Sequence, residues 1–358
     1  MNYKIKEINL HITEYCKGHC PMCYATDEHM IRKHGNIETL KLIVHNSITY
    51  GKIDTFVLVG GDPCEHPNLM KLLKYIKEEG DKNHISTKSL VISNTHDYKE
   101  NGENVCIEEV CKYVDGMCLT VHGENPEEHD KFNGCKGSYE HVINNLRKYC
   151  KLKKDGQSVC IIINLMPQTV IKMENIIKNV LFDLEGKIDC FAIQRIALIG
   201  RACGSKKYFI ESNDINSVLY ICNKIKKEHG CFFEFVDAFP FCSIKPEYRG
   251  LLPRGGCNWG KDFCAVFADG TISRCAMSKN KLSANITELD TQEKFSTFWN
   301  YDEELVKFRN KEHLDEQCKN CNLIEECGGA CVLAREKGDP YKTEIPEKGH
   351  DYLAKRRK

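Results

Sequence analysis

The chain has 358 residues, of which 41% are hydrophobic, so it is long enough for one large α/β domain and a smaller module. Lys plus Arg and Asp plus Glu both number 51, and this balance argues against a nucleic-acid-binding protein, which shows a basic excess. The apolar runs are only strand-length and none forms a signal peptide, so the sequence predicts a cytoplasmic protein without a membrane span.

From residue 5 to about 227 the sequence alternates short β-rich runs with longer amphipathic stretches. This alternation predicts βαβ units around a parallel sheet. Six such units fit a partial (β/α)6 barrel of the TIM type, with the chemistry at the carboxyl ends of the strands, although a doubly wound sheet fits the same pattern. The predicted strands are 8–12, 55–59, 89–92, 116–121, 159–164 and 191–196, and the predicted helices are 37–49, 68–78, 107–113, 139–151, 175–184 and 214–229.

The chain changes character near residue 230. From Cys231 onward, Gly, Pro, Cys and turn signals crowd together and regular periodicity fades. Such a segment buries little apolar surface by itself, and metal clusters would supply the missing stability. We therefore expect a barrel domain over residues 1–230 and a small cysteine-rich module over residues 231–358.

The cysteines, 22 in all, are the outlying part of the composition. In a chain without an export signal, so many cysteines indicate metal or cluster binding and a background of buried thiols. Cys16, Cys20 and Cys23 form a CxxxCxxC triplet directly after the first predicted strand. Three thiolates on one short loop can hold three irons of a [4Fe–4S] cluster and leave the fourth iron open. A zinc site completed by His11 or His19 is the alternative.

The triplet after the first strand of a β/α barrel resembles the signature of the radical S-adenosylmethionine (SAM) superfamily. The resemblance implies that the open iron binds SAM, and that an electron from the cluster cleaves SAM to methionine and a 5′-deoxyadenosyl radical that abstracts a substrate hydrogen. Cys16, Cys20 and Cys23 are the residues on which this catalysis would depend. Relatives usually place an aromatic residue before the third cysteine; here it is Met22, whose thioether can also pack on the adenine ring.

Residues 60–63, Gly-Gly-Asp-Pro, resemble the GGEP segment of the family at the end of the second strand. The resemblance implies close approach of SAM to the glycine backbone and pairing of Asp62 with the SAM ammonium group. Thr120 and His122 close the fourth strand, where relatives place a hydroxyl on the SAM ribose. Asn164 ends the fifth strand. Its side chain either joins this pocket or makes its hydrogen bonds within the fold. The candidate SAM-binding residues are thus Met22, Gly60, Gly61, Asp62, Pro63, Thr120, His122 and Asn164.

A second cysteine pattern fills the C-terminal part of the chain. It consists of Cys257, Gly270, Cys275, Cys318, Cys321, Cys327 and Cys331. This spacing resembles the SPASM extension, CxnGx4C…CxxCx5CxxxC…C, which is found on radical SAM enzymes that modify peptides and proteins. The resemblance implies two auxiliary [4Fe–4S] clusters in addition to the catalytic one.

The family's connectivity assigns ligands to each auxiliary cluster. Carried over, it gives Cys257, Cys275, Cys331 and one upstream cysteine to auxiliary cluster I, and Cys318, Cys321 and Cys327 to auxiliary cluster II. Cys242 is the expected upstream ligand, and Cys264 is the alternative. The last cysteine of the pattern is missing, and His350 or Asp351 stands near its position and could ligate iron. Alternatives are an open iron, or zinc on the three cysteines of cluster II.

The resemblance implies a radical SAM enzyme that acts on a peptide, as a maturase that forms thioether or other crosslinks in ribosomally synthesised peptides. One alternative is an anaerobic sulfatase maturase that makes formylglycine; those enzymes place an Asp base after the cysteine of Gx4C, where this chain has Ala276. Others are the modification of a cofactor precursor such as a tetrapyrrole, and a non-enzymatic zinc-stabilised scaffold.

The partners follow from this assignment. The expected substrate is a peptide or protein, and the expected electron donor is of the flavodoxin or ferredoxin type. Only 15 residues precede Cys16, too few for a leader-binding domain, so the substrate binds directly or arrives with a separate recognition protein. We expect neither nucleic acid nor membrane as a partner.

Overall fold

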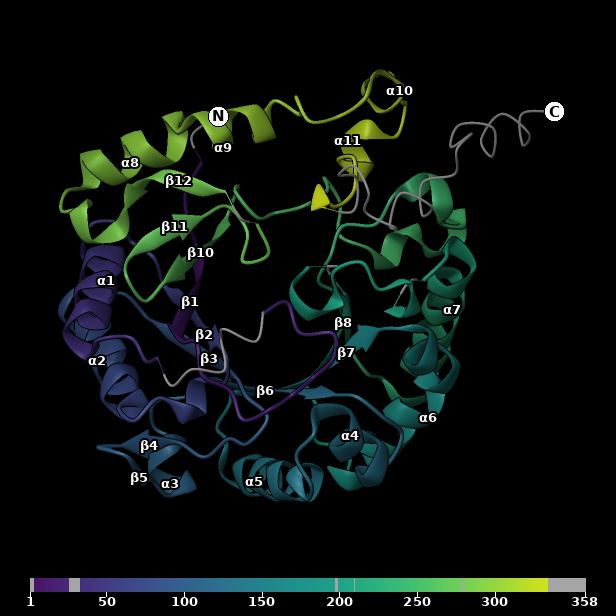
Figure 1. Ribbon diagram of the computed structural model, residues 1–358, viewed down its shortest axis with the longest axis horizontal. Helices are drawn as coiled ribbons and strands as arrows, with labels where there is room; N and C mark the ends of the chain where they lie inside the picture. The colour runs from purple at the N-terminus through teal and green to yellow at the C-terminus, as the bar shows by residue number, and fades with distance from the viewer. Residues whose placement is uncertain (1–2, 26–32, 197–198, 209, 279, 334–358) are drawn as a thin grey trace.

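The computed structural model describes residues 3–25, 33–196, 199–208, 210–278 and 280–333. Their architecture is a ten-stranded sheet with helices on its outer face, in the order β12-β11-β10-β1-β2-β3-β6-β7-β8-β9 (Figure 1). The strands from β10 to β9 in this order pair in parallel. The predicted α/β fold with a central parallel sheet is confirmed, and all the predicted strands are present.

The parallel strands begin and end within a few residues of the predicted positions. They are β1 (Glu7–Thr13), β2 (Thr55–Gly60), β3 (Lys88–Ile92), β6 (Gly116–Val121), β7 (Ser158–Leu165) and β8 (Cys190–Arg195), with β9 (Phe233–Phe235) added at the edge. In β1, Ile8, Leu10 and Ile12 are fully buried, whereas Asn9 and His11 line an inner cavity. This period of two separates the packed face from the functional face. A small hairpin, β4 (Lys99–Glu100) and β5 (Glu103–Asn104), stands apart.

Helices surround the sheet, with α1 and α2 on one side and α6 and α7 on the other (Figure 1). Their bounds are α1 (Ile37–Thr49), α2 (Leu69–Lys82), α3 (Ile107–Val110), α4 (Pro126–Asn133), α5 (Ser138–Leu152), α6 (Pro167–Asp183) and α7 (Ser212–His229). α6 begins earlier than predicted because Pro167 occupies the first turn, where its missing N–H costs nothing, and Thr169 closes a capping box on Met166. α3 is one turn, since Gln157 caps the carbonyls of Cys111 and Val114.

The cysteine-rich part continues the barrel sheet. β10 (Phe263–Phe267) lies parallel to β1, with Cys264 opposite Ile8, and β11 (Thr271–Ser273) and β12 (Lys281–Asn285) extend it in antiparallel fashion. Short helices follow: α8 (Gln292–Tyr301), α9 (Glu303–Arg309), α10 (Glu316–Lys319) and α11 (Ile324–Cys327). Cys264 is completely buried in β10, so it packs as a small hydrophobic side chain in the core. Among the described residues, no helix has the length and apolar character needed to cross a bilayer.

His96 is a buried imidazole held in its neutral form. Its Nδ1 lies 3.1 Å from the Tyr98 hydroxyl, and its Nε2 lies 3.2 Å from the carbonyl oxygen of Cys118. The tautomer that carries its proton on Nε2 satisfies both contacts, since Nε2–H donates to the carbonyl and Nδ1 accepts from the hydroxyl. Burial lowers the pKa of His96 from 6.5 to about 4.

We expect the free energy of unfolding of the His96→Asn variant to depend less on pH than that of the wild type. Because the pKa is lower in the folded chain, the unfolded chain takes up the proton first, and the free energy of unfolding falls as the pH drops from 6.5 towards 4. Between pH 7 and pH 5 one such histidine accounts for about 2 kcal/mol. Urea unfolding at both pH values measures the difference. The exposed His84→Asn is the control, and equal pH dependence in H96N and wild type would contradict the assignment.

Candidate active site

Three cysteine thiols gather on the loop that follows β1. Cys16, Cys20 and Cys23 are half-buried and form no disulfide. The Gly18 N–H donates to Cys16 Sγ at 3.2 Å. Burial raises the pKa of all three thiols, that of Cys20 to about 12, and the charge of Cys23 adds to the rise at Cys20. Three thiolates so close together need a bound cationic group, so this donor set fits an iron–sulfur cluster.

Three separate parts of the barrel fix this loop. The His19 N–H donates to the carbonyl of Asn133 at 2.7 Å, and the Arg201 N–H donates to the carbonyl of Cys23 at 2.9 Å. The buried Tyr24 hydroxyl donates to the carbonyl of Gly60 at 2.8 Å. The end of α4, the turn after β8 and the end of β2 therefore hold the triplet in place.

The glycines at the end of β2 allow a close backbone approach. Gly60 has φ +137°, and a Cβ on it would lie 2.1 Å from the carbonyl oxygen of Thr13. A Cβ on Gly61 would lie 2.2 Å from the carbonyl oxygen of Tyr15. The N–H groups of Gly61 and Asp62 donate to these same two carbonyls at 2.8 and 2.9 Å. The glycine pair is thus joined directly to the strand end that leads into Cys16.

Asp62 joins the GGDP segment to the end of β3. It is buried, and its carboxylate accepts hydrogen bonds from the Ser93 hydroxyl at 2.6 Å, the Asn94 N–H at 2.9 Å and the Cys64 N–H at 3.0 Å. Asp62 is the N-cap of the 3-10 turn Pro63–Glu65, and Asp62 and Pro63 do not line the two cavities described below. These hydrogen bonds position the segment beside the cavity.

A cavity of about 240 Å³ lies beside the triplet at the carboxyl ends of the strands. Cys20 and Cys23 form one wall. The cavity brings together most of the predicted SAM-binding residues, namely Met22, Gly60, Gly61, Thr120, His122 and Asn164. These side chains come from separate strands and meet because parallel strands end at the same edge.

His122 contributes a neutral ring to the site. Its Nε2 lies 3.8 Å from Cys20 Sγ, and its ring stacks on Phe132 at 4.7 Å and on His129 at 5.3 Å between centroids. Burial, together with the charge that His129 would carry, lowers the pKa of His122 to about 3. The imidazole therefore brings no positive charge to the thiols.

Several residues of the cavity wall were not predicted. Asn94 follows β3, and Gln194 and Arg195 end β8, so each stands where polar side chains gather at strand ends. Applying the argument used for Asn164 to every strand would have identified them. Trp259 and Met277 come from the C-terminal module, and no local signal places them beside β1 and β8.

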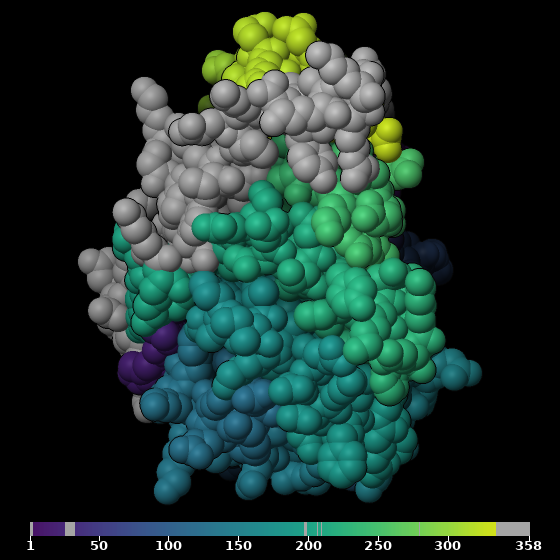
Figure 2. Space-filling view, turned by 90° about the vertical axis from the view of Figure 1, so that its right-hand side faces the viewer, coloured from purple at the N-terminus to yellow at the C-terminus, as the bar shows by residue number. Residues whose placement is uncertain are grey.

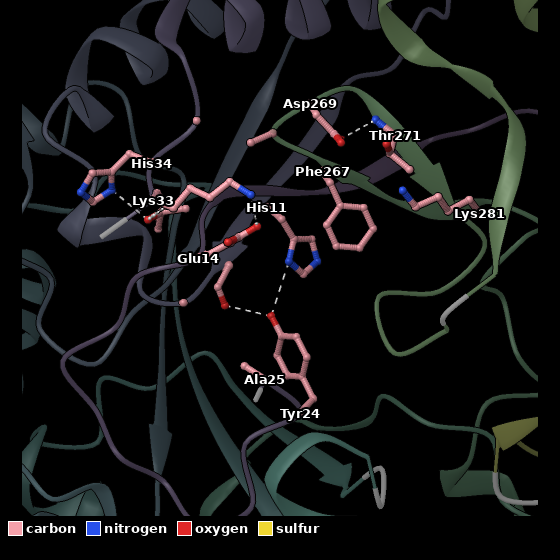
Figure 3. A pocket seen from close by; sticks show the side chains of 15 residues that line it. His11, Glu14, Tyr24, Ala25, Lys33, His34, Phe267, Asp269, Thr271 and Lys281 are labelled. Atoms are coloured by element: carbon pink, nitrogen blue, oxygen red, sulfur yellow. Dashed lines mark hydrogen bonds and ion pairs between the residues drawn. The ribbon is translucent and has the colours of Figure 1, made fainter. Parts of the chain in front are cut away.

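A second cavity, of about 300 Å³, adjoins the first and shares His11, Tyr24, Gly60 and Gly61 with it. Figure 3 shows charged side chains around it: Glu14 pairs with Lys33 at 3.1 Å, and Asp269 accepts from the Thr271 N–H at 2.9 Å, while Lys281 stands beside Phe267. This cavity lies between β1 and the β10–β11 hairpin, so the barrel and the C-terminal module line it together.

The C-terminal cysteines lie in several turns and short helices of the module. Burial raises the pKa of Cys275 to about 11, and the charge of Cys257 contributes to this rise. Cys242 lies in a turn that packs on α11, where the adjacent Phe241 N–H donates to Cys327 Sγ at 3.5 Å. This contact brings the turn towards a cysteine assigned above to cluster II, and Gly256, next to Cys257, packs on Gly328 in the same region. His350 lies outside the described residues.

A single zinc ion and an iron–sulfur cube require different spacings of the thiols that bind them. A zinc ion with Zn–S distances of about 2.3 Å holds its sulfurs within about 4 Å of one another. A cube of four irons spreads them farther, because each thiolate binds a different iron. In the part of the chain that the structure describes, no three His, Cys, Asp or Glu side chains form a single-ion site.

Comparison with known proteins agrees with this geometry. Residues 10–180 match the model of the radical SAM superfamily, and residues 257–322 match that of SPASM, an iron–sulfur cluster-binding domain. An AdoMet-dependent heme synthase of Methanosarcina barkeri is 22% identical over 353 residues, which cover 94% of this chain and 93% of that protein. An S-adenosylmethionine-dependent nucleotide dehydratase of Selenomonas ruminantium is 26% identical over 182 residues, 50% of this chain and 58% of that protein.

Solved structures share the fold over nearly the whole chain. SuiB of Streptococcus suis, bound to the precursor peptide SuiA, superimposes with a TM-score of 0.71 at 16% identity, covering 95% of this chain and 74% of SuiB. The structure of anSMEcpe with bound AdoMet and the Cp18Cys peptide superimposes with a TM-score of 0.66 at 15% identity, covering 98% of this chain and 97% of that one.

Proposed function

We propose that this chain, which belongs to the radical SAM superfamily and carries a C-terminal SPASM domain, is a maturase of ribosomally synthesised peptides. When bound, the [4Fe–4S] cluster and SAM supply a 5′-deoxyadenosyl radical that abstracts hydrogen from an unactivated carbon. The observation that carries the proposal is the wall of the cavity beside Cys20 and Cys23, to which the SPASM side contributes Trp259, Ala276 and Met277. A substrate seated there lies between the triplet and the SPASM domain.

The chain's own residues bind and orient the reactants. Gly60 and Gly61 let SAM approach the backbone at the end of β2 without meeting a side chain. Thr120 and Asn164 offer hydroxyl and amide groups to the ribose. The apolar Ile162, between them on the inner face, helps to exclude water from the reacting carbon.

The shape of the hollow supports a peptide as the substrate. The two cavities meet at His11 and Tyr24, so the hollow continues from the triplet towards the β10–β11 hairpin. Its outer part carries the charged Glu14, Lys33 and Lys281. An extended peptide presents both a side chain for the inner cavity and polar groups for the outer one. SuiB and anSMEcpe, which share this fold, were solved with peptides bound.

Formylglycine formation is less well supported. The sulfatase maturases carry an Asp base after the cysteine of Gx4C, and in this chain the equivalent side chain is the methyl group of Ala276, which faces the cavity. A methyl group cannot take a proton from the substrate. A crosslink in a peptide fits this wall better than the oxidation of a sulfatase residue.

We expect the enzyme to change the mass of a peptide encoded beside its gene. The test co-produces the chain anaerobically with each short neighbouring open reading frame and measures the peptides by mass spectrometry. A crosslink removes the mass of two hydrogen atoms, and tandem spectra locate the joined residues. The control is the variant with Cys16, Cys20 and Cys23 replaced by Ala, which leaves the peptide unmodified. Unchanged peptides with an enzyme that cleaves SAM would contradict the proposal.

A tetrapyrrole is the second candidate substrate. The similarity to the heme synthase of Methanosarcina barkeri along the chain favours it. Arg195 adds to this, because it lines the inner cavity with its guanidinium 4.4 Å from the ring centroid of Phe239, and a guanidinium binds carboxylates such as propionates. Formation of 5′-deoxyadenosine with mesoporphyrin or with the peptides as additive distinguishes the two. Stimulation by mesoporphyrin alone would replace the peptide proposal.

A further inference from the structure

Cys242 lies in the 3-10 turn Phe241–Ser243, directly against the end of α11. The Phe241 N–H donates to Cys327 Sγ at 3.5 Å. A second contact joins the same two parts of the chain, since the Gly255 N–H donates to the carbonyl of Glu326 at 2.7 Å. In Figure 2 the yellow segment of the chain, which contains α10 and α11, lies at one end of the molecule. The residues before β10 and the C-terminal helices therefore form one packed unit.

The three cysteines of the C-terminal helices are held in place by local hydrogen bonds. Asp315 caps α10 by accepting from the Cys318 N–H at 2.8 Å. The Cys321 N–H donates to the carbonyl of Cys318 at 3.1 Å, and the Leu323 N–H donates to Cys321 Sγ at 3.4 Å. N–H groups that point at Cys321 and Cys327 suit thiolates, because they stabilise negative charge on sulfur.

The electrostatic neighbours of Cys242 agree with this geometry. The thiol charges that act on Cys242 are those of Cys327, Cys318 and Cys321. Because such an effect weakens with distance, this agrees with the packing of the turn on α11.

Cys275 has a different set of neighbours. The thiol charge that raises its pKa is that of Cys257, with a smaller contribution from the Asp237 carboxylate. Burial and the charge of Asp237 likewise raise the pKa of Cys257. Cys242 and Cys275 therefore differ in the thiols that act on them, although Gly256, next to Cys257, packs on Gly328, next to Cys327.

We propose that Cys242, Cys318, Cys321 and Cys327 together hold auxiliary cluster II, with Cys242 in place of the missing last cysteine of the SPASM pattern. Four thiolates complete the coordination of a cube, so no iron of this cluster is open to substrate. The role left to cluster II is electron transfer or structural support. The proposal does not depend on which substrate the enzyme modifies.

The first test counts iron and sulfide in the anaerobically purified holoenzyme and its C242A variant. A cube that lacks one thiolate loses its corner iron or the whole cluster, so we expect C242A to contain between about one and about four fewer irons per chain. The electron paramagnetic resonance signal of the reduced protein loses one component. Cys150→Ala, which removes an equally half-buried thiol far from both sets, is the control. Unchanged iron and an unchanged spectrum in C242A would overturn the proposal.

Double variants decide which cluster Cys242 serves. If Cys242 and Cys318 ligate the same cluster, C242A/C318A loses at most about four irons, the content of one cube, whereas C242A/C257A loses iron from two cubes. The reverse result would place Cys242 in cluster I: C242A/C318A would then lose iron from two cubes, and C242A/C257A would lose iron from one cube only. If C242A does not fold, Cys242→Ser serves as the second variant. Its hydroxyl can still ligate iron, and we expect a shifted electron paramagnetic resonance signal. A C242S spectrum identical to the wild type also overturns the proposal.

Discussion

The triple variant Cys16→Ala/Cys20→Ala/Cys23→Ala is expected to lose all reductive cleavage of SAM and about four irons per chain, the content of one cube. The three thiols lie on one half-buried loop, and burial together with the charges of neighbouring thiols raises the pKa of Cys16 and Cys20, so the thiolates are stable only when a cluster is bound. Removing them leaves the cluster without protein ligands. Dithionite-dependent formation of 5′-deoxyadenosine, followed by chromatography, and iron analysis of the same sample measure both losses.

The iron that remains in the triple variant counts the auxiliary clusters, with about four irons for each. A matched control replaces three cysteines away from all the cluster candidates, Cys106, Cys150 and Cys190, by Ala, and we expect full iron content and full cleavage. Zinc in place of iron in the wild type, with no cleavage after reconstitution, would contradict the assignment of the triplet and favour a structural metal site.

Gly61→Ala is expected to weaken SAM binding at least tenfold and to reduce the iron content of the catalytic cluster. The new Cβ would lie 2.2 Å from the carbonyl oxygen of Tyr15 and 2.4 Å from its carbonyl carbon. Both are backbone atoms next to Cys16, so the clash can be relieved only by moving the cluster loop or the end of β2. Equilibrium binding of SAM to the reconstituted enzyme measures the effect.

Gly250→Ala is the matched control, because no heavy atom lies within 4 Å of the Cβ position and its φ is not in the left-handed region. We expect wild-type SAM affinity and iron content from G250A. If G61A also binds SAM with wild-type affinity, the close approach between the GGDP segment and the cluster loop has no part in the site.

The sequence predicted the barrel well because its signals are local. Strands such as β7 are continuous apolar runs bounded by turns, which is typical of parallel strands covered on both faces. The triplet and the glycine pair were predicted for the same reason: both are short patterns whose chemistry depends on residues adjacent in sequence. Thr120 was predicted from the resemblance to the family, and Asn164 from its place at the end of a strand.

The remaining features depend on contacts between distant segments. Asp62 shares a motif with SAM-binding relatives, yet its hydrogen bonds to Ser93 and Asn94, which no spacing predicts, occupy its carboxylate. Cys242 and Cys327 are far apart in sequence and meet only because a turn packs on α11. Tyr24 links the triplet to Gly60 through one hydroxyl, and its position after Cys23 is the only local signal it gives.

The pairing of β10 with β1 also limits how the barrel and the C-terminal part of the chain can move relative to one another. The ladder runs from Glu7 to His11, so the backbone that leads into the triplet and the backbone that leads to Cys275 belong to the same hydrogen-bonded array. A hinge between them would have to break that ladder, whereas side-chain contacts between domains can slide. We therefore expect the loop of the triplet and the turn that carries Cys275 to keep their relative position when a substrate binds.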